Sequence, residues 1–173
     1  MNISVPLRIT GDTKDIIKHK DGRIEVIEDH NIVVNGILPI LASAIKGDEV
    51  HGISYWAIGS GDPSWDSNGS NPERSETVLT NEIGRKQIPS DNIQFIKADG
   101  NVSDVPTNMI EVTMTFDTDD INGAWREFAL FAGDATENKD SGIMINKKHH
   151  DIISKSKSMI VERHIRFTFM LED

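Results

Sequence analysis

Strict alternation of apolar and polar side chains is the feature that most constrains the fold of this chain. In the segment 159–171, one side carries Met159, Val161, Ile165, Phe167, Phe169 and Leu171. The segment 110–116 alternates in the same way. A period of two places every second side chain on one face, so both segments predict half-buried β-strands. Arg163 interrupts the apolar side of the last strand and therefore needs a partner or an exposed strand end.

Turn signals divide the remainder of the chain into further strands. Lys-Asp-Gly at 20–22 separates two apolar–polar runs, residues 15–19 and 23–28. The Asp-Gly pair predicts a hairpin, because glycine readily adopts the positive φ that the turn requires. Pro6 marks the extended segment 3–9 as an edge strand or a loosely attached arm, because proline lacks the amide hydrogen that an interior strand uses.

Five more segments are expected to be strands: 53–59, 85–88, 93–98, 125–131 and 142–146. Residues 60–75 form a long stretch rich in Gly, Ser, Asn, Asp and Pro, and long loops inside compact domains are often functional. Trp65 lies in this loop without apolar neighbours, whereas Trp56 in the preceding strand is expected in the core. Residues 77–83 are expected to form a helical turn or a short extended piece.

One segment has the period of an α-helix, since one helical face carries Val34, Ile37, Leu38, Leu41 and Ile45. Pro39 is tolerated only in the first turn, where the amides have no intrahelical partner. Placing Asn35 as the N-cap meets that condition, so a helix is predicted over 36–46 with Gly47 as its C-terminal break. We expect its apolar stripe to pack on the sheet rather than to form a groove for a partner.

These elements predict a mainly β fold: an antiparallel β-sandwich or a small barrel with one α-helix packed against it. The 173 residues fit a single domain, with an N-terminal arm and hairpin over 1–30 and a β-rich core over 31–173. No stretch approaches the roughly 18 to 20 apolar residues that span a membrane, and the N-terminus lacks the pattern of a secretory signal. The absence of cysteine excludes disulfides and thiolate chemistry and suits a reducing compartment during folding.

The charge balance argues against a nucleic-acid partner. The formal net charge is −10, so most of the surface repels phosphates. The one basic cluster, residues 147–157, also contains aspartate and serine. We expect it to be the solvated end of a hairpin, with nucleic-acid binding as the alternative.

No familiar catalytic or metal-binding motif occurs. The chain lacks a G-x-S-x-G elbow and an H-E-x-x-H pattern, and the adjacent His149 and His150 would point to opposite faces of a strand. The acidic run 117–123 has the composition of a calcium loop but fails the EF-hand pattern, because Ile121 stands where a ligand is needed. We therefore predict a polar turn there, with calcium as the alternative. We expect no enzyme activity, no cofactor, and no catalytic, cofactor-binding or metal-binding residue.

Three charged residues form a separate hypothesis. Glu127 is expected to share its strand face with Trp125, Ala129 and Phe131, where a carboxylate needs a partner. Arg85 is the candidate, because its planar fork can bind two carboxylate oxygens, and Glu82 is expected to help hold it. The functional alternative is that the two glutamates form an acid–base pair in a cleft.

The order of several short motifs resembles structural proteins of tailed bacteriophages and related tail-like particles, of the tail-fibre, baseplate or tail-tip kind. The motifs are His30-Asn31 with Val33-Val34-Asn35-Gly36, then Ala57-Ile58-Gly59-Ser60-Gly61, then Thr77, Leu79, Glu82 and Arg85 at T-x-L-x-x-E-x-x-R spacing, then Trp125-Arg126-Glu127-Phe128-Ala129-Leu130-Phe131. The resemblance covers about residues 28–170. Ala129 stands where glycine is common in those proteins.

The resemblance implies a non-enzymatic virion subunit, made in the bacterial cytoplasm and assembled with copies of itself and with other tail or baseplate subunits. It implies no nucleic-acid or membrane partner. Two alternatives are a host-receptor or carbohydrate-binding module on the same particle, with Trp65 and Trp56 as stacking surfaces, and a cell-wall hydrolase. We expect the 60–75 loop and the N-terminal arm to carry contacts between subunits. Deletion of residues 63–71 should then leave a folded monomer that no longer assembles.

Overall fold

The computed structural model describes residues 6–172. Its strands are β1 (Leu7–His19), β2 (Ile24–Val33), β3 (Tyr55–Gly59), β4 (Glu82–Gln87), β5 (Ile93–Ile96), β6 (Val102–Ser103), β7 (Met109–Phe116), β8 (Gly123–Ala132), β9 (Ile143–Met144), β10 (Asn146–Lys155) and β11 (Met159–Leu171). The helices are α1 (Ile37–Lys46), the single turn α2 (Trp65–Asn68) and a short 3-10 turn, η1 (Ser90–Asn92). Within residues 6–172, no helix has the length and hydropathy needed to cross a membrane.

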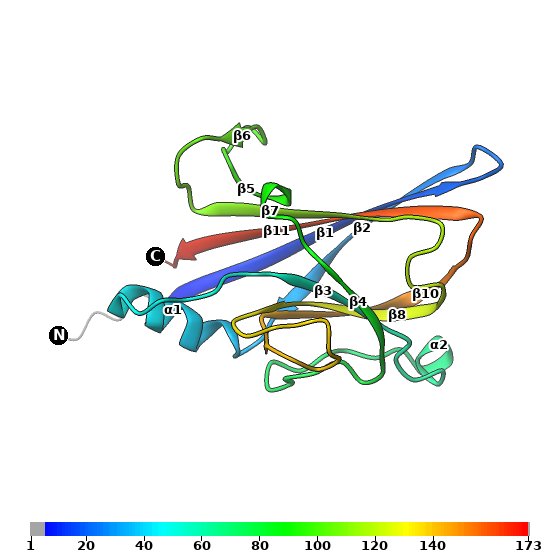
Figure 1. Ribbon diagram of the computed structural model, residues 1–173, viewed down its shortest axis with the longest axis horizontal. Helices are drawn as coiled ribbons and strands as arrows, with labels where there is room; N and C mark the ends of the chain where they lie inside the picture. The colour runs from blue at the N-terminus through cyan, green and yellow to red at the C-terminus, as the bar shows by residue number, and fades with distance from the viewer. Residues whose placement is uncertain (1–5, 173) are drawn as a thin grey trace.

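All the strands belong to one antiparallel sheet, in the order β4-β3-β8-β10-β2-β1-β11-β7-β5-β6, with β9 beside β8. Across residues 6–172 the sheet is open and not closed into a barrel. The sheet bends from one layer into the other between β2 and β10. These two strands are joined by only two residue pairs, Val33 with Asn146 and Ile32 with Lys147. Figure 1 shows the resulting layers, with β1, β11 and β7 in one and β3, β8 and β4 in the other. The predicted mainly β, antiparallel fold is therefore confirmed, in the two-layered form and not as a barrel.

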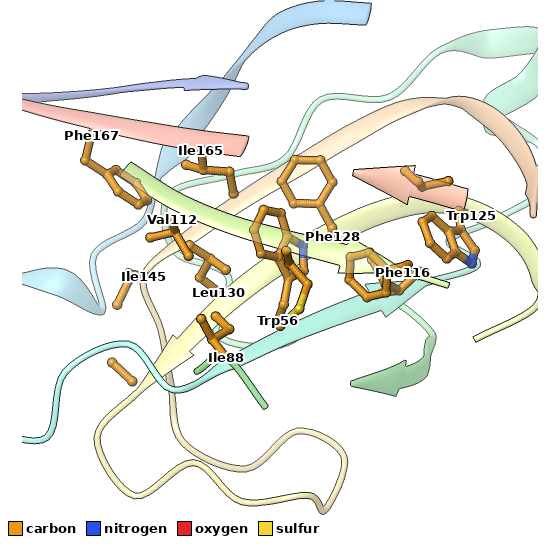
Figure 2. Close-up of a cluster of buried hydrophobic side chains, with 14 of the residues drawn as sticks. Trp56, Ile88, Val112, Phe116, Trp125, Phe128, Leu130, Ile145, Ile165 and Phe167 are labelled. Atoms are coloured by element: carbon orange, nitrogen blue, oxygen red, sulfur yellow. The ribbon is translucent and has the colours of Figure 1, made fainter. Parts of the chain in front are cut away.

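The core lies between the two layers, because the inner faces of both carry apolar side chains. Figure 2 shows the cluster, which includes Trp56, Phe116, Trp125, Phe128, Leu130, Ile165 and Phe167. Trp56 is fully buried, as expected, and its ring meets that of Phe116 edge-on at a centroid distance of 6.2 Å. Such edge-to-face packing adds specific geometry to the burial of apolar area. The alternation in β7 and β11 thus directs their apolar residues into a shared core.

The predicted hairpin is present, and its strands are longer than the sequence pattern suggested. β1 and β2 pair from Gly11–Asn31 to Lys18–Ile24, and Gly22 takes the positive φ of 91° that the turn requires. β1 also pairs along its whole length with β11, which extends it to Leu7. The expected arm is therefore strand from Leu7 onward, and residues 1–5 lie outside the described part. Residues 77–81 form no helical turn, and β4 begins directly after them.

Helix α1 matches the predicted boundaries to within one residue. Its N-cap is Gly36, and no side chain accepts a hydrogen bond from the amides of the first turn. The prediction that Asn35 caps the helix is therefore wrong. Gly47 ends the helix in the left-handed conformation, with a φ of 85°, as predicted.

The predicted packing of the helical stripe is only partly correct. Ile37 is buried and Leu41 is half-buried against the core, but Leu38 and Ile45 are 55% and 88% exposed. The reason is the position of the helix. Figure 1 shows α1 at one end of the two layers, where it caps their opening and does not lie flat on a face. Only one side of the helix therefore reaches the core.

Candidate functional site

Three of the motifs noted in the sequence, 57–61, 77–85 and 125–131, meet at a buried polar cluster beneath the loop 60–81. Glu127 of β8 lies opposite Gly59 of β3 and is fully buried. Its carboxylate accepts hydrogen bonds from the amides of Thr80 at 3.0 Å and Asn81 at 2.8 Å. A Cβ on residue 59 would lie 2.5 Å from the Glu127 Cγ, so the glycine makes room for this carboxylate.

Lys147 supplies the countercharge in this cluster. Its ammonium group lies 3.3 Å from Glu127 Oε2 and donates to Glu76 Oε1 at 2.6 Å. Lys147 and Lys155, near the two ends of β10, are 0% and 3% exposed. The expectation that residues 147–157 form a solvated hairpin end is therefore wrong for both lysines. Sequence composition could not show this, because their acidic or carbonyl partners come from distant loops.

The hypothesis about Arg85 is half correct. Two nitrogen atoms of the Arg85 guanidinium donate hydrogen bonds to the Glu82 carboxylate, Nε to Oε1 at 2.7 Å and Nη2 to Oε2 at 2.8 Å. Both side chains are buried. Its guanidinium also lies 4.6 Å from the ring centre of Phe131. The expected pair with Glu127 is wrong because of strand register: Glu82 and Glu127 lie opposite Gly59, whereas Arg85 lies opposite Ala57.

The expected face of β8 also needs a correction. Trp125 packs in the main core with Phe128, whereas Ala129 and Phe131 belong to a second cluster on the other side of the strand. The pairing of β8 with β10 shifts register between His149 and Ile153. An irregularity of this kind breaks the two-residue period on which the sequence prediction rests.

The 60–75 loop is fastened to the sheet by side chains of β8 and β10. Arg126 binds Asp66 with two hydrogen bonds, at 2.8 and 2.7 Å. Trp65 stacks on His149, with ring centroids 4.0 Å apart and an angle of 25° between the planes. Deletion of residues 63–71 would leave Arg126 and His149 without these partners. The loop therefore contributes to the fold, which counts against a fully folded monomer after this deletion. The expected contacts of the loop with other subunits stay a prediction.

Ser70, His149 and Glu127 form a line that resembles a nucleophile, base and acid. Ser70 Oγ lies 3.0 Å from His149 Nδ1, but His149 Nε2 lies 3.8 Å from Glu127 Oε2, beyond hydrogen-bond distance. Burial, and then the charge of Lys147, lowers the pKa of His149, which keeps the ring neutral. Glu127 already has its amide and ammonium partners. The line therefore lacks the coupling that a catalytic triad needs.

The acidic 117–123 turn encloses an ammonium group. Lys155 Nζ donates to the carbonyl oxygen of Asp117 at 2.8 Å and lies 3.3 Å from Asn122 Oδ1. Lys86 reaches the same turn and binds Asp120 Oδ2 at 2.5 Å. These lysines take the oxygen atoms that a calcium ion would use. No cluster of three or more histidine and carboxylate side chains with metal-site spacing occurs among residues 6–172.

A shallow hollow crosses the outer face of β2, β1, β11 and β7. Its charged side chains are paired with one another: Arg166 donates to Glu111 at 2.8 Å, and His164 lies 2.9 Å from Glu162. The contact with Glu111 raises the pKa of His164, burial opposes this, and Glu162 adds to the rise. The arrangement is a cross-strand ladder of opposite charges, which stabilises a sheet.

Two strand edges carry exposed apolar side chains alongside charged ones. On β2, the residues from Ile24 to His30 pair with β1 and have no strand on their other edge among residues 6–172. Here Ile24 and Val26 are 62% and 55% exposed. On β1, the residues from Leu7 to Thr10 pair only with β11, and Leu7 is 53% exposed. An open strand edge with apolar side chains is a template for pairing with another chain.

Comparison of the chain with models of protein families, with curated proteins and with solved structures gave no match. The functional assignment therefore depends on the residues and their geometry. Two features stand out: polar clusters that are neutralised inside the fold, and strand edges that are left open.

Proposed function

We propose that this chain is a non-enzymatic structural subunit of a phage tail or tail-like particle, which assembles with copies of itself and with other tail, baseplate or fibre proteins. The observation that carries the proposal is the open edge of β2, with Ile24 and Val26 exposed beside unpaired backbone groups. Main-chain pairing at such an edge provides affinity, and the apolar side chains provide specificity. The motif order from His30 to Phe131, which resembles that of phage-tail proteins, supports the proposed particle type.

The paired charges support the same proposal. Glu82, Glu127 and Asp66 are each bound by a cation, and the contacts of Glu127 and Asp66 join the loop 60–81 to β8 and β10. A structural subunit needs this rigidity, whereas a general acid or base needs a carboxylate that can exchange protons with a substrate. The carbohydrate-binding alternative depends on the face of Trp65, and His149 stacks on that ring. The geometry therefore favours assembly over sugar binding.

Purified particles from the source bacterium test the proposal directly. Gold-labelled antibodies against this chain should mark one position on the tail in electron micrographs, and the chain should sediment with the particles. Deletion of its gene should give particles that lack this position or fail to assemble. Recovery of the chain only in the unassembled fraction, with normal particles in the deletion strain, would refute the proposed function.

A further inference from the structure

The two open strand edges lie at opposite ends of the molecule. Figure 1 shows the turn of the β1–β2 hairpin projecting at one end, whereas the start of β1, helix α1 and the C-terminus lie at the other. One end therefore presents the edge of β2 on a projecting hairpin. The other presents the edge of β1 beside α1.

The edge of β1 forms one wall of a groove, which we call the β1–α1 groove. It runs between the start of β1, the end of β2 and the first turn of α1, and its lining includes Leu7, Asn31, Leu38 and Arg74. Leu7 and Leu38 are 53% and 55% exposed there. Both walls of the groove thus offer apolar side chains, next to a strand edge that is open among the described residues.

The floor of this groove holds an unsatisfied amide. The side chain of Asn31 lies against Gly11, its cross-strand partner, and residue 31 is only 8% exposed. Neither its Oδ1 nor its Nδ2 atom has a hydrogen-bond partner. Both atoms are also buried from solvent, so the unpartnered amide costs free energy in the isolated chain. A strand added at this edge would relieve that cost by drawing the amide into the groove, where its donor and acceptor can bond a peptide backbone.

The edge of β2 complements this groove in shape and in charge. It is an extended strand with a free edge, and its exposed Ile24 and Val26 match the apolar walls. It is also acidic: the Glu28 carboxylate lies 3.3 Å from Lys14 Nζ on the neighbouring strand, and its side chain is still 69% exposed. Arg74 at the groove forms no ion pair within residues 6–172. A carboxylate from an incoming strand would thus meet a free guanidinium group.

We propose that copies of this chain associate head to tail, with the β2 edge of one copy added as a strand to the Leu7–Thr10 edge in the β1–α1 groove of the next. This inference rests on the proposed assembly function and names the partner at its open edges. Ile24 and Val26 pack beside Leu7 and Leu38, and Glu28 faces Arg74. Because the two surfaces differ, the contact is heterologous, and its repetition gives a ring or a filament.

Engineered cysteines test the contact, since the native chain contains no cysteine. Variants carrying Val26→Cys or Ile24→Cys are mixed with variants carrying Leu7→Cys or Leu38→Cys and then oxidised. At least one mixture should give a disulfide-linked dimer, because Cα atoms within about 7 Å can be bridged. Glu137→Cys, on an exposed loop elsewhere, is the matched control and should give none with any of them. Absence of a mixed dimer above this control, or dimers formed by Val26→Cys alone, would overturn the head-to-tail contact.

Charge exchange gives an independent readout by sedimentation velocity. Arg74→Glu and Glu28→Arg should each weaken self-association by about fivefold, because each replaces an attraction by a repulsion. An equal mixture of the two variants should recover association, since each hairpin then meets a groove of opposite charge. Equal association of both single variants and the wild type would contradict the model. A chain that occurs in particles but forms neither the cross-link nor the self-assembly would overturn this inference and leave the proposed function standing.

Discussion

The guanidinium of Arg163 lies against the carboxylate of Asp15 inside the molecule, across the β1–β11 pair. Two hydrogen bonds join them, Nε to Oδ1 at 2.9 Å and Nη2 to Oδ2 at 2.8 Å. Arg163 is fully buried, and its guanidinium lies 4.3 Å from the ring centre of Phe128. The interruption of the apolar face of β11 is thus resolved by a buried partner on the neighbouring strand, one of the two solutions that the sequence predicted.

Removal of one member of this pair should be costly. We expect Arg163→Ala to lower the free energy of unfolding by about 3 to 5 kcal/mol, because it leaves the Asp15 carboxylate buried and uncompensated. The double variant Arg163→Met with Asp15→Leu should lose less, because it removes both charges. Urea denaturation at neutral pH measures both. A single variant within about 1 kcal/mol of the wild type would contradict this account.

The pair of Arg85 and Glu82 should behave in a similar way. Arg85→Ala should destabilise the fold sharply, and Arg85→Lys should restore only part of the loss, because lysine cannot bind both carboxylate oxygens or stack on Phe131. The matched control is Arg8→Ala, which removes an exposed ion pair and should change stability by less than about 1 kcal/mol. Full rescue by lysine in urea denaturation would show that only the charge matters.

Helix α1 offers a graded test of its packing. Ile37→Ala should cost about 2 to 5 kcal/mol, because the side chain is buried in the core. Leu41→Ala should cost less, since Leu41 is only half-buried, and Leu38→Ala should lie within about 0.5 kcal/mol of the wild type. Thermal unfolding of the three variants gives the order. A large loss of stability for Leu38→Ala in the isolated chain would contradict the exposed position of Leu38 on α1.

His150 should make the fold sensitive to acid. Its Nδ1–H donates to the Asp151 carbonyl at 2.7 Å and its Nε2 accepts from Arg163 at 3.0 Å, so the ring is neutral. Burial, and then the charge of Arg163, lowers its pKa to about 3 from 6.5. As the pH falls, the His150 ring takes up a proton in the unfolded chain before it does so in the folded chain. The stability that the neutral ring contributes is therefore present above pH 6.5 and is lost as the pH falls toward 3.

Substitution of His150 isolates that contribution. The free energy of unfolding should fall less steeply for His150→Gln than for the wild type between about pH 6.5 and pH 4. Urea denaturation across this range measures the difference. Identical slopes for the two proteins would show that His150 does not titrate abnormally.

His164 should have the opposite dependence. Its contact with Glu111 raises its pKa above 6.5, against the effect of burial. The native state therefore binds the proton more tightly, so the stabilisation is fully present below pH 6.5 and is lost as the pH rises through the raised pKa. The stability advantage of the wild type over His164→Gln should be larger at about pH 5.5 than at about pH 9, and salt should reduce it. An advantage independent of pH would refute this.

The sequence determined the features that depend on near neighbours. The two-residue alternation gave the strands 110–116 and 159–171, and Asp21-Gly22 gave the hairpin. The position of Pro39 set the start of α1 to within one residue, and Gly47 set its end. Each of these depends on backbone conformation and side-chain direction over a few residues, which local sequence controls.

Only the tertiary structure decided which charges meet and which apolar faces are covered. Asp15 and Arg163 are 148 positions apart, and Lys147 and Glu76 are 71 apart. Strand order and register bring such residues together, and neither can be read from a local period. For the same reason the α1 stripe looked like core, yet Leu38 and Ile45 are exposed because no sheet lies beneath that side of the helix.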